Sequence, residues 1–163
     1  MFNDLFSLKG RIALVTGGSR GIGKMIAAGF LHAGAAKVYI TARKAGPCEA
    51  TAKELTAQYG GECIALPIDI STVQGCELLA SEYRKREQRL DILVNNAGVY
   101  AFAPLDGITP EHFHSQFDLN VLGLLLVSRG HQVAQLCFGG SALTTAPGKG
   151  TLSRFALVVR RAI

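Results

Sequence analysis

The sequence predicts an α/β fold in which a parallel sheet carries helices on both faces. Three observations support this prediction: short apolar segments alternate with segments of helical periodicity, each alternation is long enough for a crossover, and a glycine-rich turn follows the first apolar segment. The chain has 163 residues, of which 48% are hydrophobic and 18% are charged. This length and composition indicate one globular domain, or most of one, rather than a disordered or membrane-spanning chain.

The first strand and the first helix lie on either side of the glycine-rich turn. Residues 11–16 (RIALVT) form a short, mostly apolar run of the kind that is buried on both faces in a parallel sheet. From Gly21 onward, apolar residues recur at helical spacing, and the helix is expected to stop near Gly34. Residues 37–41 (KVYIT) are rich in β-branched and aromatic side chains and predict the second strand.

The alternation continues to residue 95. The predicted segments are a helix over 49–59 that ends at Gly60 and Gly61, a strand over 63–68, a helix from Ser71 or Thr72 to about residue 86, and a strand over 90–95. A further helix is predicted over 110–127, because a capping threonine, a proline and an acid coincide at Thr109, Pro110 and Glu111. The fourth strand is then an open edge unless the tail supplies a fifth, and such an edge favours pairing with other chains.

The turn after the first strand has the composition of a phosphate-binding loop. It reads Thr16-Gly17-Gly18-Ser19-Arg20-Gly21-Ile22-Gly23. Glycines allow a sharp turn and a close approach to a pyrophosphate, and the following helix presents its first amides to the negative charge. A plain tight turn explains many such motifs, but here the required strand precedes the turn and the required helix follows it. We therefore predict nucleotide binding.

Four motifs, covering about residues 8–128, resemble the short-chain dehydrogenase/reductase family in their order and spacing. The pattern Thr-Gly-x-x-x-Gly-Ile-Gly resembles the family's turn rather than the common fingerprint Gly-x-Gly-x-x-Gly, and residues 90–98 (LDILVNNAG) look like its fourth strand and Asn-Asn-Ala-Gly turn. Asp69 matches the family's adenine-contacting acid, and Asn120 matches the asparagine of its catalytic set. The resemblance implies a Rossmann-like fold, incomplete at its C-terminal side.

The resemblance also implies an oxidoreductase that transfers a hydride between a nicotinamide cofactor and a carbonyl or alcohol. The opening residues 6–11 (FSLKGR) and the glycine-rich turn look most like the 3-oxoacyl-thioester reductases of the family, which use a small-molecule or acyl-thioester substrate. The expected cofactor-binding residues are Gly17, Ser19, Arg20, Gly21, Ile22, Gly23, Arg43, Asp69, Ile70, Asn96, Ala97 and Gly98.

Charge predicts which nicotinamide cofactor is used. A site for NAD places an acid about 20 residues after the turn, whereas the 2′-phosphate of NADP(H) needs a cation. Residues 35–46 contain no acid, and Arg43 follows the second strand directly while Arg20 lies in the turn. A guanidinium binds phosphate through two parallel hydrogen bonds, so we predict NADP(H). The alternative is that both arginines are solvated surface residues.

The catalytic pattern of the family is incomplete here. Its members use a Tyr-x-x-x-Lys pair and an upstream serine, but no tyrosine follows Asn120 in this sequence. Ser141 is a weak candidate for the serine, because its Gly-Gly-Ser-Ala context fits a loop equally well. Lys149 lies between two glycines, in a turn rather than the helix that a catalytic lysine needs. Asn120 is the one surviving catalytic candidate, and we expect little or no hydride transfer.

The tail has a composition unlike the rest of the chain. Residues 1–118 contain 12 Lys and Arg against 12 Asp and Glu, so the net charge of +5 arises entirely after Leu119, where no acid occurs. We divide the chain into an NADP-binding half-domain at 1–128 and an atypical basic tail at 129–163. Family members usually run to about 250 residues, so the chain reads as truncated. The tail is either a shifted frame or alternative exon, or a diverged but functional C-terminus.

The remaining expectations concern partners and location. No basic face with a binding motif for nucleic acid is present, the four cysteines have no metal-ligand spacing, and no segment reads as a secretory signal or a membrane span. We expect a cytoplasmic protein that binds neither a metal ion, nor nucleic acid, nor a membrane. The helix over 110–127 exposes apolar residues, which predicts self-association. The rival function is a non-catalytic nucleotide-binding or interaction module that pairs with a full-length reductase through this helix.

Overall fold

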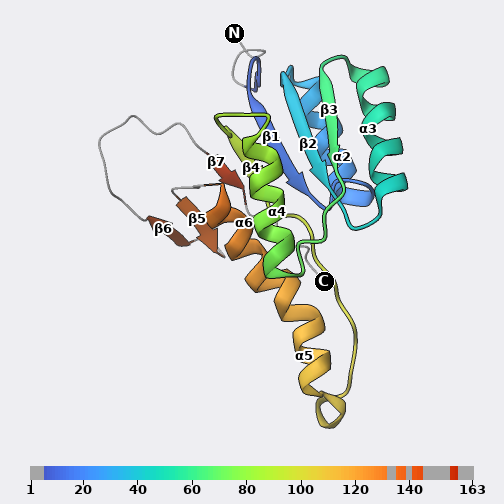
Figure 1. Ribbon diagram of the computed structural model, residues 1–163, viewed down its shortest axis with the longest axis vertical. Helices are drawn as coiled ribbons and strands as arrows, with labels where there is room; N and C mark the ends of the chain where they lie inside the picture. The colour runs from blue at the N-terminus through green and yellow to red at the C-terminus, as the bar shows by residue number, and fades with distance from the viewer. Residues whose placement is uncertain (1–5, 132–134, 139–140, 145–154, 158–163) are drawn as a thin grey trace.

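The computed structural model describes residues 6–131 with their side chains, and the backbone of 135–138, 141–144 and 155–157. A five-stranded parallel sheet with the order β3-β2-β1-β4-β7 forms the centre (Figure 1). Its strands are β1 (Ile12–Thr16), β2 (Lys37–Thr41), β3 (Glu62–Leu66), β4 (Ile92–Val94) and β7 (Phe155–Leu157). The predicted α/β fold with a parallel sheet is confirmed.

Helices α2 (Gly21–His32) and α3 (Ala45–Tyr59) cover one face of the sheet, and α4 (Val73–Arg84) and α6 (Leu124–Gly130) cover the other. The remaining helical segments are the short η1 (Leu105–Gly107), α5 (Pro110–Phe117) and the π-helical η2 (Asp118–Gly123). Alternate residues of β1 belong to different cores, because successive side chains of a strand point to opposite faces. Ala13 and Val15 pack with α2 and α3, whereas Leu14 packs with α4 and α6.

Several predicted boundaries differ from the structure: β3 covers 62–66 instead of 63–68, and α4 covers 73–84 instead of 71 or 72 to about 86. Helix α3 begins at Ala45, four residues before the prediction, because Pro47 lies in its first turn, where a missing N–H breaks no helical hydrogen bond. Strand β4 covers only 92–94 of the predicted 90–95. Its flanking residues bond through their side chains: the Asp91 carboxylate accepts from the Ile12 amide (2.9 Å), and Asn95 Nδ2 donates to Ser128 Oγ of α6 (3.0 Å).

The predicted final helix is present and continues to Gly130, with a π-helical stretch in its middle. The stretch η2 contains Asn120, and a π turn inserts one extra residue into a helical turn, which often happens at functional sites. Gly123 ends it against α4's leading loop, where an added Cβ would lie 2.6 Å from the carbonyl oxygen of Ile70. No larger residue fits there without displacing that backbone.

The tail supplies a fifth strand. Strand β7 pairs in parallel with β4, with Leu93 opposite Ala156, so β4 is not an open edge. Strands β5 (Gln135–Phe138) and β6 (Ser141–Thr144) form a separate antiparallel pair, in which Ser141 lies opposite Phe138. Strands are therefore present after Arg129, although the sequence shows no clear helical or strand periodicity there.

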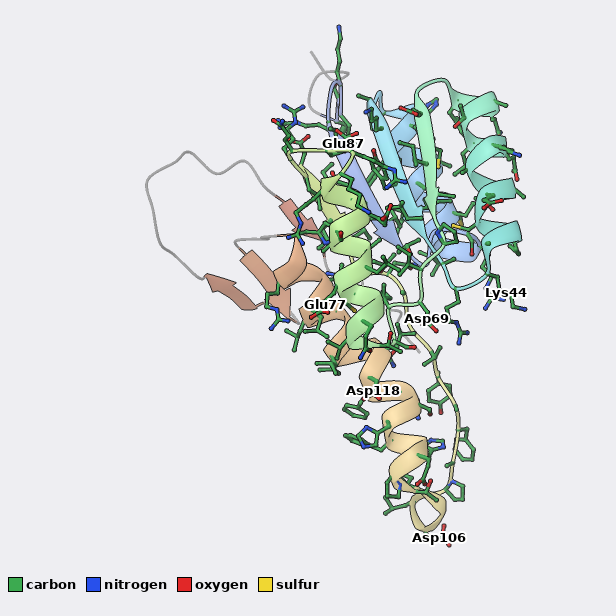
Figure 2. The ribbon with its side chains drawn as sticks, viewed as in Figure 1. Lys44, Asp69, Glu77, Glu87, Asp106 and Asp118 are labelled. Carbon is green, nitrogen blue, oxygen red and sulfur yellow. The ribbon has the colours of Figure 1, made fainter. Side chains whose placement is uncertain are left out.

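An ion pair at the amino end of the sheet ties β2 to the loop after α4. Glu87 accepts hydrogen bonds from Lys37 Nζ (2.6 Å) and from the Tyr39 hydroxyl (2.7 Å). Burial alone would raise the pKa of Glu87, but these two hydrogen bonds outweigh it and lower the pKa overall. Figure 2 shows Glu87 at the opposite end of the sheet from Lys44 and Asp69, so this pair belongs to the fold and not to the glycine-rich turn.

The end of α6 is anchored by an aromatic stack. His131 is buried and packs edge-on against Tyr83 of α4, with ring centroids 5.1 Å apart, and Tyr83 packs in the same way against Tyr39 (4.9 Å). His131 Nδ1 lies 2.8 Å from the Val127 carbonyl oxygen, and burial lowers the pKa of its ring. The stack holds the last turn of α6 on the sheet.

The cysteines with described side chains are free and buried. Burial raises the pKa of Cys48 to about 11 and that of Cys63 to about 12, so these thiols stay protonated at neutral pH, and Cys76 is shifted in the same direction. Cys137 lies in β5, where the description stops at the backbone. Within the described residues, no helix combines the length and apolar character needed to cross a bilayer.

Candidate functional site

The candidate site lies at the carboxyl ends of β1 to β4. Because these strands are parallel, the segments that follow them meet at one edge of the sheet, where α/β proteins bind ligands. The glycine-rich turn follows β1, Arg43 follows β2, Asp69 follows β3, and Asn96 follows β4. Figure 2 shows Asp69 and Lys44 at this end of the sheet.

The glycines of the turn are required by geometry. Gly17 (φ 68°) and Gly21 (φ 55°) adopt left-handed backbone conformations that disfavour other residues. Gly23 is buried beneath the turn, where an added Cβ would collide with the carbonyl oxygen of Gly17 and lie 2.6 Å from Asn96 Nδ2. Helix α2 can therefore start directly beneath the turn.

The start of α2 is an open anion-binding position. Arg20 is its N-cap residue and makes no side-chain capping bond, and the first turn contains no acid. The first amides of the helix therefore have no side-chain acceptor, and together with the helix dipole they favour a negative charge. Thr51 of α3 holds this loop in place by donating from Oγ1 to the Ser19 carbonyl oxygen (2.9 Å).

Thr16 joins the turn after β1 to the turn after β4. Its buried hydroxyl donates to the Val94 carbonyl oxygen (3.3 Å) and accepts from the amides of Asn96 and Ala97 (both 3.0 Å). Asn96 reciprocates, because its Nδ2 donates to the carbonyl oxygens of Thr16 (2.9 Å) and Gly17 (3.3 Å). The Asn96 amide nitrogen thus shapes the glycine-rich turn from below.

Two arginines stand at the edge where the adenosine half of a dinucleotide would lie. Arg20 and Arg43 are exposed, and within residues 6–131 neither forms an ion pair, whereas Lys24 of the same helix is paired with Glu54 (2.7 Å). Lys44, next to Arg43, adds a third positive charge at the start of α3. The guanidinium groups of Arg20 and Arg43 are therefore available to an anionic ligand.

The segment after β3 places an acid at the same edge. Asp69 is exposed, and its Oδ1 accepts a hydrogen bond from the Ser71 amide (3.0 Å), which leaves carboxylate acceptor sites open to solvent. Ile70 lies in the core, so only its backbone faces the edge. Gly75 of α4 packs directly on the Asp69 carbonyl oxygen, which leaves no room for a Cβ.

Asn120 clamps the chain that leaves the β4 turn. Its Oδ1 accepts from the Val99 amide (2.9 Å) and its Nδ2 donates to the Val99 carbonyl oxygen (2.8 Å). Gly98 lies under this clamp, where a Cβ would be 3.3 Å from Asn120 Oδ1. The side chain is exposed at the mouth of the site, and both of its polar atoms are used on the backbone.

A sequence model of the family described as short chain dehydrogenase matches residues 11–142, about four fifths of the chain. The chain belongs to the short-chain dehydrogenase family. Its glycine-rich turn and its Asn-Asn-Ala-Gly turn are therefore the family's segments, and the structure brings them into direct contact.

Relatives and solved structures show which short-chain dehydrogenases are similar. A rhamnolipids biosynthesis 3-oxoacyl-[acyl-carrier-protein] reductase of Pseudomonas aeruginosa is 51% identical over 116 residues, 71% of this chain and 44% of the relative. The RhlG/NADP active-site complex of the same organism matches with a TM-score of 0.73 and 47% identity, covering 78% of this chain and 48% of that one. An NADP-bound 3-oxoacyl (acyl-carrier-protein) reductase of Agrobacterium tumefaciens matches with a TM-score of 0.73 and 33% identity, covering 80% and 50%.

This short-chain dehydrogenase chain spans about half the length of the relatives it matches. No tyrosine follows Asn120, so this sequence contains no Tyr-x-x-x-Lys pair there. Tyr39 and Tyr83 are buried in the core, and Tyr100 has Pro104 four residues on instead of a lysine. Ser141 opens strand β6, where only its backbone is described, and Lys149 lies outside the described residues.

The sequence reasoning missed two polar residues that build the site. Thr16 belongs to the turn motif, but its place at the end of a buried strand also indicates that its hydroxyl is buried and needs hydrogen-bond partners within the protein. Ser128 gave no signal at all: its Oγ accepts from Asn95 Nδ2 (3.0 Å) and donates to the Leu124 carbonyl oxygen (2.8 Å). This pair fixes α6 to the end of β4.

Proposed function

We propose that this chain is the NADP(H)-binding half of a short-chain dehydrogenase that reduces carbonyl compounds. The observation that carries the proposal is the joining of the glycine cradle, the uncapped start of α2 and two unpaired arginines at one edge of the sheet. The cradle has the shape for a pyrophosphate and the arginines have the charge for a 2′-phosphate. NADP-bound relatives at 33% to 47% identity support the same cofactor.

Each residue has a role in this proposal. The amides at the start of α2 hold the pyrophosphate, Arg20 and Arg43 bind the 2′-phosphate, and Asp69 accepts hydrogen bonds from the adenine. The cofactor supplies the hydride when it is bound. Gly17, Ser19, Gly21, Ile22, Gly23, Ile70, Asn96, Ala97 and Gly98 complete the predicted contact set, and Asn120 holds the backbone beside the nicotinamide end.

The relatives support a substrate class for this proposal. The Pseudomonas aeruginosa relative carries the name of a 3-oxoacyl-[acyl-carrier-protein] reductase, which supports an acyl thioester with a 3-oxo group. An unperturbed phenol titrates near pH 10, so a tyrosine acts as the general acid only beside an ammonium group. Since this sequence has no such pair after Asn120, we propose that the chain binds the cofactor but does not turn over substrate. We also propose that the cofactor-binding half ends at residue 128.

The experiment that tests the proposal measures binding and turnover separately. We expect NADPH to raise the thermal unfolding midpoint, and NADH at the same concentration to raise it less, because only NADPH offers a 2′-phosphate to the arginines. With a 3-oxoacyl thioester added, the absorbance of NADPH at 340 nm should stay constant. No midpoint shift with NADPH would contradict the proposed binding, and steady NADPH consumption would contradict the assignment as inactive.

A second candidate function, an interaction module, rests on α5. This eight-residue segment, which continues into η2 and α6, has no buried residue. Phe113 and Phe117 stack on its surface with centroids 4.0 Å apart while each remains nearly half exposed, and Figure 1 shows the helix projecting from the body. We propose that a second copy of the chain covers this face.

Sedimentation velocity tests this association. The wild-type chain should sediment as a dimer or larger species, and Phe117→Glu should shift it toward monomer, because a charge cannot be buried cheaply in an apolar contact. The control Gln58→Glu changes an exposed residue of α3 and should leave the distribution unchanged. A sharp wild-type monomer would contradict self-association, and capture of a full-length reductase by that monomer would favour the rival partner.

A further inference from the structure

The chain segment that follows the Asn-Asn-Ala-Gly turn is held by side-chain amides of the long helix, the continuous helical stretch over 110–130 made of α5, η2 and α6. Asn120 pairs with Val99 in both directions, as described above. Gln116 repeats this arrangement two residues further along: its Oε1 accepts from the Ala101 amide and its Nε2 donates to the Ala101 carbonyl oxygen, both at 3.2 Å. Each amide side chain therefore replaces the neighbouring strand that the segment lacks.

The spacing of the two contacts shows how the segment lies. Residues four apart on a helix are separated by about 6 Å along its axis. Residues two apart in an extended chain are separated by about 6.6 Å, and their peptide groups point the same way. Gln116 and Asn120 therefore match Ala101 and Val99 in register, and Figure 1 shows the segment running alongside α5.

A third contact fixes the orientation of the Gln116 amide. Its Nε2 also lies 2.8 Å from His112 Nε2, which accepts a hydrogen bond in the tautomer that carries no proton on that nitrogen. The two N–H groups of Gln116 are thus used on His112 and on the Ala101 carbonyl oxygen. A reversed amide would set N–H against the Ala101 N–H, so one orientation is favoured. Both His112 and Gln116 are partly buried.

Gln116 and Asn120 therefore both hold this segment, and Gln116 holds it at the point farther from the Asn-Asn-Ala-Gly turn. Within the described residues, the hydrogen bonds to the backbone of 99–103 come from Asn120 and Gln116 alone. This backbone continues directly from Asn96, whose side chain supports the glycine-rich turn. If Ala101 were displaced, the segment would be held only at Val99, next to Gly98, at the nicotinamide end of the proposed site.

We propose that Gln116 is a positioning residue of the cofactor site, which acts by holding Ala101 and so the turn at 96–98. The proposal rests on the proposed function, since it concerns affinity for NADP(H). It requires no contact between Gln116 and the cofactor. The hydrogen bonds that it contributes also exist without cofactor, which makes the clamp measurable in the free protein.

Two measurements on the full chain test this role. Gln116→Leu keeps the side-chain volume but removes all three hydrogen bonds, and should speed hydrogen exchange at the Ala101 amide by about tenfold or more. The same variant should raise the dissociation constant of NADPH by about three- to tenfold. Gln116→Glu keeps an acceptor for the Ala101 amide but sets a carboxylate oxygen against the Ala101 carbonyl oxygen, so it should retain only part of the protection. Gln58→Leu, at an exposed position of α3, is the matched control for both measurements.

The outcomes separate the proposal from its foundation. Unchanged exchange at Ala101 in Gln116→Leu would overturn the clamp. Faster exchange with unchanged NADPH affinity would overturn the positioning role. A wild-type chain that does not bind NADPH would overturn the proposed function and with it the positioning role, while the exchange rates would still report the clamp. An unchanged urea midpoint in Gln116→Leu, together with both expected changes, would support a local effect.

Discussion

Thr16→Val is expected to lower the free energy of unfolding by about 2 to 4 kcal/mol, because each buried group that loses its partner costs about 1 to 3 kcal/mol. Valine has nearly the shape of threonine but offers no hydroxyl. The amides of Asn96 and Ala97 would lose their acceptor and the Val94 carbonyl oxygen would lose a donor, all at a position with 1% exposure. Urea denaturation followed by circular dichroism measures the loss.

Thr16→Ser is the matched control for this prediction. Serine retains the hydroxyl and removes one methyl group, so the loss should stay near about 1 kcal/mol. Affinity for NADPH should follow the same order, since the hydroxyl holds the two turns of the proposed site together. Equal losses of stability in the valine and serine variants would mean that the methyl group, and not the hydrogen-bond network, matters at this position.

Arg43→Gln is expected to weaken NADPH binding by about 10- to 100-fold, because a hydrogen bond to a charged partner contributes about 1.5 to 3 kcal/mol. NADH binding should be unchanged, since NADH has no 2′-phosphate to lose a partner. Arg43 is exposed and forms no ion pair within residues 6–131, so its removal leaves no carboxylate unpaired. Isothermal titration with each nucleotide gives the two constants.

The charge-matched control is Lys53→Gln, which removes a positive charge from an exposed position of α3. It should lower NADPH affinity only slightly, and less so as salt is added, because distant surface charges are screened. An equal loss of NADPH and NADH affinity in Arg43→Gln would show that this arginine does not distinguish the two cofactors. In that case Arg20 would be the next candidate for the 2′-phosphate.

Local patterns predicted the sheet and its helices well, because burial on two faces imposes them residue by residue. Leu14 and Tyr39 on one face, and Val15 and Ile40 on the other, each lie where strand alternation requires. The glycine-rich turn was equally readable, since its φ values and the close approach of Gly23 permit no other residue.

Contacts between distant segments could not be predicted in this way. The Asn95–Ser128 and Gln116–Ala101 hydrogen bonds depend on where the long helix lies relative to β4, and no local periodicity encodes that placement. The early start of α3 is not marked by an apolar periodicity, and Pro47 is accommodated there because a first-turn proline breaks no helical hydrogen bond. The sequence predicts a fifth strand only conditionally, because it shows that β4 is an open edge unless the tail pairs with it.

The central position of β1 has a consequence for the way the chain assembles during synthesis. Ala13 pairs with Val38 on one side, 25 positions later, and with Ile92 on the other, 79 positions later. Closing the longer loop costs about 1 kcal/mol more chain entropy than closing the shorter one. At a translation rate of about 5 to 20 residues per second, β1 and β2 wait several seconds for β4 to leave the ribosome. The glycine-rich turn is therefore completed late, because its Asn96 support follows that strand.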